Sequence, residues 1–288
     1  MPETREIGAN EGGAGAAHAP SGSFSVMGIL NVTPDSFSDP GEFFDPDKAV
    51  SHAMKMLDEG ADIIDVGGES TRPGSDPVSP DEELRRVVPT VRGILSERPD
   101  ATISIDTYRA ATAEAALEAG AKIVNDVTAA HGDSRMLSLM AEADCPVVLM
   151  HMKGEPKTMQ NDPRYDDVMK EVREFLSGRA EAVISAGVSP ERIILDPGVG
   201  FGKTVEHNLL LLKNLGEIVD VGFPILIGTS RKGFIGKLTT SGDASGGRVF
   251  GTVATSVLAY ERGATLFRVH DVRANRDALE VAAAFRRV

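Results

Sequence analysis

The sequence predicts a (β/α)₈ TIM barrel, a single α/β domain with eight parallel strands and helices between them. Eight short apolar runs rich in Ile and Val recur along the chain, and each is followed by a polar or glycine-bearing turn and a longer amphipathic segment. The runs are continuous rather than alternating, which is typical of parallel strands covered on both faces. Eight such units in about 265 residues also match the usual size of this fold, about 250 residues.

The strand ends decide between this fold and a doubly wound open sheet. The predicted strands span residues 24–30, 62–66, 101–106, 122–126, 146–151, 192–196, 224–228 and 265–270. Nearly all end in polar or ionisable residues, namely Asn31, Asp65, Asp106, Asn125 with Asp126, His151, Asp196, Ser230 with Lys232, and Arg268 with His270. A barrel collects all strand ends at one rim, whereas an open sheet places its site at one switch point. The spread of polar ends favours the barrel and predicts one convergent site.

The first two predicted helices carry local start signals. Asp45 is an N-cap before Pro46 at the first helical position, and Gly60 suits the position just after the helix. The second helix opens with Ser79 and Glu82, which predict a capping box. Its expected buried stripe is Leu84, Val87, Val88, Val91 and Leu95.

The composition excludes several classes of protein. The net charge of −13 argues against a general nucleic-acid or anionic-membrane surface, so we expect neither partner. No stretch approaches the roughly 18 apolar residues that cross a bilayer, and the start has no secretory signal, so a cytoplasmic protein is expected. Residues 1–23 are rich in Gly and Ala and are predicted to be a mobile N-terminal leader, with the barrel spanning residues 24–288.

Two long flexible loops are predicted, after the first and second strands. "NVTPDSFSDPGEFFD", residues 31–45, and "GGESTRPGSDPVS", residues 67–79, exceed the usual 2–6 residues of a strand-to-helix connection. Such loops serve as active-site flaps in many enzymes. In the first, Asn31 could offer a carbonyl oxygen to a hard cation, and Asp35 could supply a negative charge. In the second, Pro73 stiffens the neighbouring Thr71 and Arg72.

The stretch "DPGVGFGKT", residues 196–204, resembles a phosphate loop but does not match one. The P-loop pattern needs a glycine where this chain has Pro197. Asp196 could instead accept two parallel hydrogen bonds from an N–H and an exocyclic NH₂ of a heterocycle. The three glycines that follow would let the backbone approach a flat ligand, although Asp196 could also simply cap the next helix.

The last two strands predict an anion site. "GTSRKGF" contains Ser230 and Lys232, and "RVHDV" contains Arg268 and His270. Adjacent final strands of barrels often bind phosphate. Arg268 and His270 alternate with apolar residues, so the period of two directs both side chains into the barrel. An interior Arg without an anion would be costly.

Together these motifs resemble the dihydropteroate synthase family, pterin-binding (β/α)₈ enzymes of folate biosynthesis. The resemblance covers about residues 24–286 in the correct order, through "NVTPDSFSD", "GGESTRPG", "ISIDT", "NDV", "LMHMKGEP", "LDPGVGFGKT", "GTSRKGF" and "RVHDV". It implies a transferase that condenses (7,8-dihydropterin-6-yl)methyl diphosphate with 4-aminobenzoate to give 7,8-dihydropteroate and diphosphate. It further implies a Mg²⁺ cofactor, a homodimer formed through the later helices, and inhibition by sulfonamides, which mimic 4-aminobenzoate.

The resemblance also implies roles for individual residues. The pterin would bind Asp106, Asn125, Asp196 and Lys232, and the diphosphate would bind Asn31, Arg268 and His270, with Asn31 as the metal ligand. The 4-aminobenzoate site would comprise Phe37, Thr71, Arg72, Pro73, Phe201 and Ser230, with Lys232 beside them. The catalytic set would be Asn31, Asp35, Lys232, Arg268 and His270, with Asp35 stabilising a cationic pterin methylene.

Two other functions share part of this pattern. A corrinoid-dependent methyltransferase that uses methyltetrahydrofolate would share the cradle of Asp106, Asn125 and Asp196, but it needs neither "RVHD" nor "GGESTRPG". A non-catalytic pterin-binding paralogue would be expected to have lost part of the diphosphate or flap residues, and none is missing. Both comparisons favour the synthase.

Overall fold

Eight parallel strands form the centre of the computed structural model, which describes residues 23–33, 45–70, 77–240 and 248–288. The strands are β1 Ser25–Asn31, β2 Ile63–Gly67, β3 Thr102–Asp106, β4 Ile123–Asp126, β5 Val147–Met150, β6 Ile193–Asp196, β7 Leu226–Ile227 and β8 Leu266–Val269. The predicted leader lies outside the described residues except for Ser23, as do residues 34–44 and 71–76 of the two predicted flaps.

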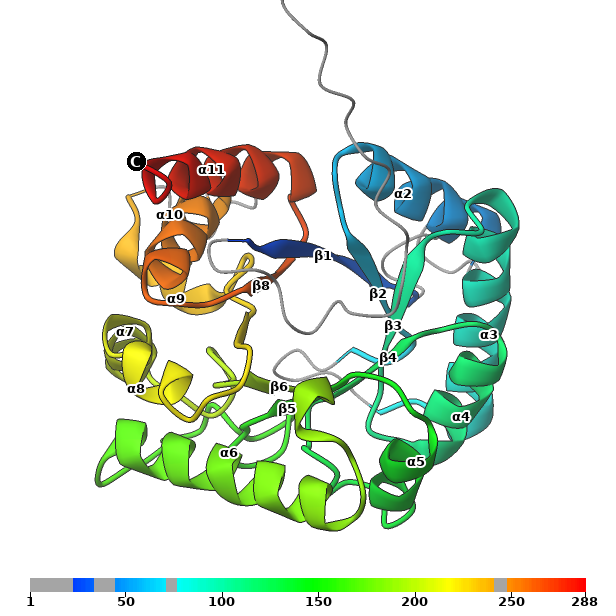
Figure 1. Ribbon diagram of the computed structural model, residues 1–288, viewed down its shortest axis with the longest axis horizontal. Coiled ribbons are helices and arrows are strands. Elements are labelled where there is room, and N and C mark those ends of the chain that lie inside the picture. The colour runs from blue at the N-terminus through cyan, green and yellow to red at the C-terminus, as the bar shows by residue number, and fades with distance from the viewer. Residues whose placement is uncertain (1–22, 34–44, 71–76, 241–247) are drawn as a thin grey trace, which may run out of the picture.

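The strands close into a barrel, as predicted. They pair in the order β6-β5-β4-β3-β2-β1-β8-β7, and an isolated parallel bridge between Leu195 and Ile225 joins the two ends. A backbone hydrogen bond of 2.9 Å from Leu195 N to Pro224 O lies beside that bridge. The ring of helices around the strands is visible in Figure 1. In a doubly wound open sheet, β6 and β7 would be edge strands with no contact between them. Their contact therefore excludes the open sheet.

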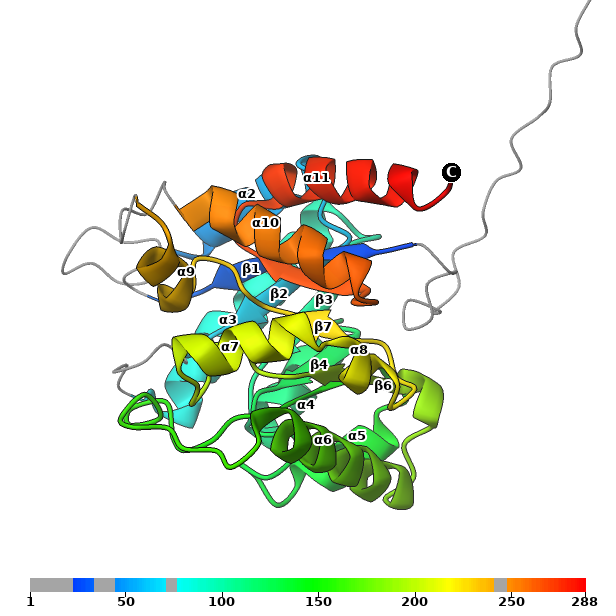
Figure 2. The same ribbon diagram turned by 90° about the vertical axis from the view of Figure 1, so that its left-hand side faces the viewer.

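Helices follow every strand. They are α2 Pro46–Asp58, α3 Pro80–Glu97, α4 Ala110–Glu118, α5 Met136–Glu142, α6 Val168–Ser185, the 3₁₀ helix η1 Pro190–Arg192, α7 Val205–Lys213, α8 Gly216–Val219, α9 Gly233–Leu238, α10 Arg248–Glu261 and α11 Val272–Phe285. Figure 2 shows α10 and α11 covering one side of the barrel, with α5 and α6 on the opposite side. Both faces of each strand are therefore buried, which explains the continuous apolar runs.

The predicted start of the first helix is confirmed, and that of the second is confirmed in part. Asp45 caps α2 by accepting hydrogen bonds from the backbone N–H groups of Asp47 and Lys48. Ser79 caps α3 through the N–H of Glu82 at 3.3 Å, but the Glu82 carboxylate binds Arg85 and Arg86 rather than closing a capping box. Two nearby guanidinium groups are stronger partners for a carboxylate than one backbone N–H.

The buried face of α3 differs from the predicted stripe. Its buried residues are Glu83, Arg86, Val87, Thr90, Val91 and Ile94. The sequence places Leu84, Val88 and Leu95 in the stripe, but the structure leaves them half-buried. An apolar count could not find this face, because two of its residues are charged and are buried through long-range partners.

The barrel interior has an apolar floor and a polar upper layer. Met27, Ile63, Ile123, Val148, Ile194, Leu226 and Leu266 form one buried cluster inside the strands. Side chains two residues further along a strand point to the same side. Asp65, Asn125, Asp196 and Arg268 hold those positions at the carboxyl ends of their strands. Phe267 packs in the separate cluster on the helix side, so the predicted inward direction of Arg268 is confirmed.

Candidate active site

A cavity of about 1080 Å³ lies at the carboxyl ends of the strands. Every predicted site residue that the structure describes lines it: Asn31, Asp106, Asn125, Asp196, Phe201, Ser230, Lys232, Arg268 and His270. The remaining predicted residues, Asp35, Phe37, Thr71, Arg72 and Pro73, lie outside the described residues. A second cavity, of about 960 Å³, lies against α6 and α7 and contains none of these residues. The barrel mouth is therefore the candidate site.

A buried ion cluster forms the base of this cavity. Arg268 Nε donates to Asp65 Oδ2 at 2.6 Å, and Arg268 Nη2 donates to Asp106 Oδ2 at 2.6 Å. Asn125 Nδ2 donates to the same Asp65 oxygen at 3.1 Å. The strand register explains the convergence, because Asp106 pairs with Asn125 and with Gly67 in neighbouring strands. The cluster fixes the orientation of three predicted ligand-binding side chains.

The acids of the cavity have raised pKa values. Burial raises the pKa of Asp106 to about 7, although the neighbouring Arg268 opposes the shift. Burial likewise raises the pKa of Asp196 to about 6, opposed by a hydrogen bond from the Gly198 N–H and by Lys232. The bond from Gly198 N to Asp196 Oδ1 measures 2.7 Å. Both acids therefore change protonation near neutral pH.

The loop after β6 is held against its neighbour by two glycines. A Cβ atom at Gly198 would lie 1.8 Å from the carbonyl oxygen of His151, and one at Gly202 would lie 2.1 Å from that of Lys153. Both glycines also have positive φ, +65° and +63° respectively, which disfavours other residues. At these two glycines the backbone therefore lies close to the loop after β5, and the approach to a flat ligand stays a prediction.

Lys203 stabilises the same loop from inside. Its ammonium donates to the carbonyl oxygens of Gly198 and Phe201 at 3.0 Å each, and lies 2.9 Å from His151 Nδ1. Burial, with the charge of Lys203, lowers the pKa of His151 to about 3, so its ring is neutral and Nδ1 accepts the hydrogen bond. The lysine that a P-loop would place on a phosphate is instead bonded to its own loop.

An aromatic and cationic wall lines one side of the cavity. Lys232 Nζ lies 3.7 Å from the centroid of the Phe201 ring, a cation–π contact. The backbone N–H of Gly200 donates to Asn208 Oδ1 at 2.7 Å, which anchors the loop that carries Phe201. Burial raises the pKa of Asp196, and the charge of Lys232 opposes this rise, so that charge reaches the base of the cavity.

The ends of β7 and β8 meet at Ser230 and His270. The Ser230 hydroxyl lies 3.0 Å from His270 Nδ1 and accepts the backbone N–H of His270 at 3.0 Å. Arg231 beside it has a positive φ of 55° and pairs with Asp271 at 2.6 Å. These contacts join the two strand ends and keep the His270 ring at the cavity.

Sequence analysis assigned no role to two residues of the site. Asp65 is fully buried and holds both Asn125 and Arg268, and Lys203 lines the cavity. Asp65 stood among the polar strand ends, and the period of two from Ile63 would have pointed it inward. No local sequence signal shows that the Lys203 side chain donates its hydrogen bonds to backbone carbonyl oxygens.

Comparisons with known proteins identify the family of this chain. The model of the family described as pterin binding enzyme matches residues 27–270. The chain is 49% identical over 257 residues to a dihydropteroate synthase of Synechocystis, covering 89% of this chain and 88% of the relative. None of the described helices combines the length and apolar character needed to span a membrane.

Solved structures show the same fold. A Xanthomonas albilineans dihydropteroate synthase with 4-aminobenzoic acid superposes with a TM-score of 0.86 at 45% identity, over 92% of this chain and 94% of that chain. A Yersinia pestis dihydropteroate synthase in complex with a sulfonamide drug gives a TM-score of 0.87 at 43% identity, over 94% of this chain and 97% of that chain. The chain therefore belongs to the pterin-binding enzymes and, among them, to the dihydropteroate synthases.

Proposed function

We propose that the pterin of the first substrate binds at the base of the cavity, against Asp106, Asn125 and Asp196. The observation that carries this assignment is the convergence of nine side chains, from the strand ends and the loops that follow them, on one cavity with buried carboxylates at its base. A pterin edge offers an N–H beside an NH₂, and an ionised carboxylate accepts both. Asp196 is a suitable acceptor, and the positive charge of Lys232 lies close to it.

The diphosphate would bind beside the pterin, at Asn31, Arg268 and His270. All three line the same cavity, and Arg268 supplies a charge that never titrates. In the described structure the Arg268 guanidinium is paired with Asp65 and Asp106. This pairing gives the arginine a fixed orientation at the site before any ligand enters.

The residues present fit a Mg²⁺ ion that relies mainly on its substrate for ligands. Among the described residues no group of three or more His, Cys, Asp or Glu side chains could hold a metal ion. Asn31 offers one hard amide oxygen, and Mg²⁺ typically takes one or two protein oxygens together with substrate phosphates and water. Bound there, Mg²⁺ would neutralise charge on the departing diphosphate.

The bond between the pterin methylene carbon and the diphosphate oxygen would break first, and the electron pair would leave with the diphosphate. Arg268 and His270 would stabilise the negative charge that develops on it. The amine nitrogen of 4-aminobenzoate would then bond to the methylene carbon and release a proton to solvent. Asp35, outside the described residues, would stabilise the cationic pterin methylene. An arylamine is nucleophilic when neutral, so the chemistry needs no strong general base.

The 4-aminobenzoate would bind at the outer part of the cavity. Phe201 offers an aromatic face, and Ser230 and Lys232 offer donors for the carboxylate. Phe37, Thr71, Arg72 and Pro73 would complete the site from the two long loops. Sulfonamides would compete with 4-aminobenzoate there, which the sulfonamide complex of the Yersinia pestis relative supports.

A homodimer in the cytoplasm would be the working form. Phe250, Ala254 and Leu258 are exposed at intervals of four residues along α10, so they form one apolar stripe. Leu209 and Leu210 are exposed on α7, which contacts α10. Exposed apolar residues on two neighbouring helices are typical of an interface between protein chains.

The decisive experiment measures diphosphate release and dihydropteroate formation from both substrates, with Mg²⁺ and with EDTA. Equal amounts of both products, formed only with the metal, are expected. Product formation that is unchanged in EDTA would remove Mg²⁺ from the proposal. Binding of the pterin without turnover, together with binding of methyltetrahydrofolate, would favour a methyltransferase instead.

A further inference from the structure

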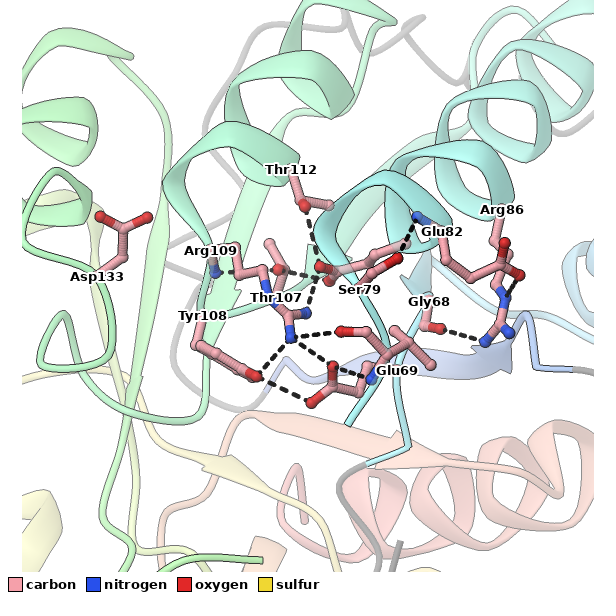
Figure 3. Close-up of polar contacts among 12 residues, drawn as sticks. Gly68, Glu69, Ser79, Glu82, Arg86, Thr107, Tyr108, Arg109, Thr112 and Asp133 are labelled. Carbon is pink, nitrogen blue, oxygen red and sulfur yellow. Dashed lines mark hydrogen bonds and ion pairs between the residues drawn. The ribbon is translucent and has the colours of Figure 1, made fainter. Parts of the chain in front are cut away.

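Lys203 is a buried cation that has no part in the function proposed above. It is only 3% exposed, yet it lines the same cavity as Asp196 and Phe201. Figure 3 shows another ion cluster, in which Arg109 and Glu69 point toward one another, but neither of these residues lines the cavity. A charge inside a protein acts on its neighbours more strongly than a charge in water. Lys203 is therefore placed to influence the groups that line the cavity.

The Lys203 ammonium joins the loop after β5 to the loop after β6. It has three N–H donors. Its acceptors are His151 Nδ1 at 2.9 Å and the carbonyl oxygens of Gly198 and Phe201 at 3.0 Å each. The His151 carbonyl oxygen lies further away, at 3.5 Å. Because each of its donors has an acceptor, the ammonium has a fixed position between the two loops.

Gly198 connects this ammonium to Asp196. The Gly198 carbonyl oxygen accepts from Lys203, and the Gly198 N–H donates to Asp196 Oδ1 at 2.7 Å. The same carbonyl oxygen accepts the N–H of Phe201 at 3.0 Å, which closes a four-residue turn. The turn and the ammonium together hold Gly198 in place. The hydrogen bond from Gly198 to the Asp196 carboxylate therefore has a fixed direction before a ligand enters.

The charge of Lys203 also acts on the Asp196 carboxyl group. Burial raises the pKa of Asp196, and the hydrogen bond from Gly198 opposes this rise. The charges of Lys232, Lys203 and Arg268 oppose it as well. Removing one of these cations should therefore raise the pKa of Asp196 further.

The influence is mutual, because Asp196 acts on Lys203 in turn. Burial lowers the pKa of Lys203 to about 7, and the charge of Asp196 opposes this shift. The charges of Lys232 and Lys153 lower the pKa further, whereas the neighbouring His151 ring is neutral. Lys203 and Asp196 therefore each favour the charged form of the other.

We propose that Lys203 is a positioning residue for the pterin, which acts through Asp196 by holding the Gly198 turn and by favouring the ionised carboxylate. The inference rests on the proposed function, which places the N–H and NH₂ edge of the pterin on Asp196. Lys203 acts without binding the pterin itself, because its donors are already used. A lysine that only stabilised the fold would weaken pterin binding by the same factor at every pH.

The first test is calorimetric titration with the hydroxymethyl dihydropterin that lacks the diphosphate, at pH 6, 7 and 8.5. This uncharged ligand excludes any direct attraction between a lysine and the diphosphate. Lys203→Met and Lys203→Gln are compared with wild type. Lys153→Met is the matched control, because Lys153 is exposed on the neighbouring loop and donates to the Arg164 carbonyl oxygen and to Glu171.

For Lys203→Met we expect the pterin Kd at pH 6 to rise about tenfold or more, because a charged hydrogen-bond donor is lost. The ratio of this Kd to that of wild type should fall toward pH 8.5. Asp196 is ionised in both proteins there, and wild-type Lys203 loses its own proton as pH rises through about 7. Asp106 titrates in both proteins, so its effect largely cancels in the ratio. Lys203→Gln, which keeps a donor without the charge, should be intermediate, and Lys153→Met should match wild type.

A second readout needs no ligand. ¹³C NMR of the aspartate carboxyl groups, with the Asp196 signal identified by its loss in Asp196→Asn, measures the pKa of Asp196 directly. This pKa should be higher in Lys203→Met and Lys203→Gln than in wild type and Lys153→Met. If neither Lys203 variant folds, Asp196→Asn carries the test, because it should lower the pKa of Lys203 as followed by ¹³C NMR of labelled lysine.

Two results would overturn the inference: an Asp196 pKa that stays at its wild-type value in the Lys203 variants, or a ratio of pterin Kd values that does not change with pH. An unchanged pKa of Lys203 in Asp196→Asn would overturn it as well. A wild-type protein that binds no pterin, but whose Asp196 pKa still rises in Lys203→Met, would overturn the proposed function and leave the coupling of Lys203 to Asp196 established.

Discussion

At the base of the cavity three buried carboxylates, Asp65, Asp106 and Asp196, lie near a single arginine, Arg268. Burial disfavours the ionised form of a carboxyl group and raises the pKa values of Asp106 and Asp196. The nearby cations, Arg268 and, beside Asp196, Lys232, oppose this rise without cancelling it. A substrate edge that donates hydrogen bonds would supply the missing compensation. We therefore expect the carboxyl groups proposed to bind the pterin to be stabilised when it binds.

Asp196→Asn should weaken pterin binding and stabilise the empty protein. The pterin affinity should fall about tenfold or more, because an NH₂ group would face a donor edge. Burial raises the folded pKa of Asp196 from 3.8 to about 6, so its contribution to stability is fully present below pH 3.8 and is lost as pH rises through about 6. At pH 7 the free energy of unfolding of Asp196→Asn should therefore exceed that of wild type by about 1–2 kcal/mol.

Calorimetric titration of the pterin and urea unfolding at several pH values would check both parts. The stability difference should be small near pH 4 and grow toward pH 7. Asp58→Asn, at an exposed site on α2, is the control and should change neither quantity. Unchanged pterin affinity in Asp196→Asn would remove this residue from the site.

Turnover should fall on the acid side of neutrality. The carboxylates proposed to accept hydrogen bonds from the pterin would have to be ionised, and their pKa values are about 7 for Asp106 and about 6 for Asp196. As pH falls through this range each acid gains a proton and loses acceptor capacity. The profile of kcat/KM for the pterin diphosphate against pH should therefore bend downward between pH 7 and 6. A flat profile down to pH 5 would show that the bound form does not depend on these acids.

At the scale of the elements, the loop after β6 depends on packing for its shape. Its supports include two glycines against the loop after β5, the Lys203 ammonium on its carbonyl oxygens, the Tyr165 hydroxyl on the Gly202 carbonyl oxygen and the Asn208 side chain on its N–H. Such a loop is rigid before a ligand binds, which lowers the entropy that binding must overcome. It carries Phe201, so its rigidity also sets one wall of the cavity.

Gly198→Ala should destabilise the protein more than Gly222→Ala. Both glycines have positive φ, so each substitution costs about 1–2 kcal/mol of backbone strain. Only at Gly198 would the new Cβ also collide with the His151 carbonyl oxygen, whereas nothing lies within 4 Å at Gly222. Urea unfolding measures the difference. Equal losses for the two variants would show that the loop moves away at little cost and is not rigid.

At the scale of the whole molecule, the exposed apolar stripe on α10 bears on assembly. Phe250 is 82% exposed, which is unusual for a large aromatic side chain. Covering it with a second copy of the chain would bury apolar surface on both partners. The stripe lies outside the barrel mouth, so assembly and catalysis can be tested separately.

Phe250→Glu should convert the proposed dimer to a monomer. Two glutamates brought together in an apolar interface would repel and lose solvation. Sedimentation velocity at micromolar concentration measures the change. Arg85→Glu on α3 is the control, because Arg85 is exposed and α3 is not one of the later helices. A wild-type protein that sediments as a monomer would refute the dimer itself.

The sequence predicted the barrel because its signals are local and repeat eight times. Apolar runs, helix caps and turns each depend on residues close along the chain, as at Asp45 and Pro46. The strand ends could be placed together because parallel strands of a barrel share one rim. The α3 face was predicted correctly at Val87 and Val91 but without Glu83, because the burial of Glu83 depends on its meeting Arg109, 26 residues away, which no period reveals.

By itself, therefore, the sequence determined the fold, the rim that carries the site and the family whose motifs lie there. Tertiary structure alone decided which partners these side chains have. Arg268 pairs with Asp65, which lies 203 residues away in the sequence. Lys203 donates to backbone carbonyl oxygens, and Arg109 binds residues at both ends of the loop between β2 and α3. The physical reason is that burial and hydrogen bonding are settled between residues brought together by strand register and helix packing, whereas sequence patterns record only which side of its own element a residue faces.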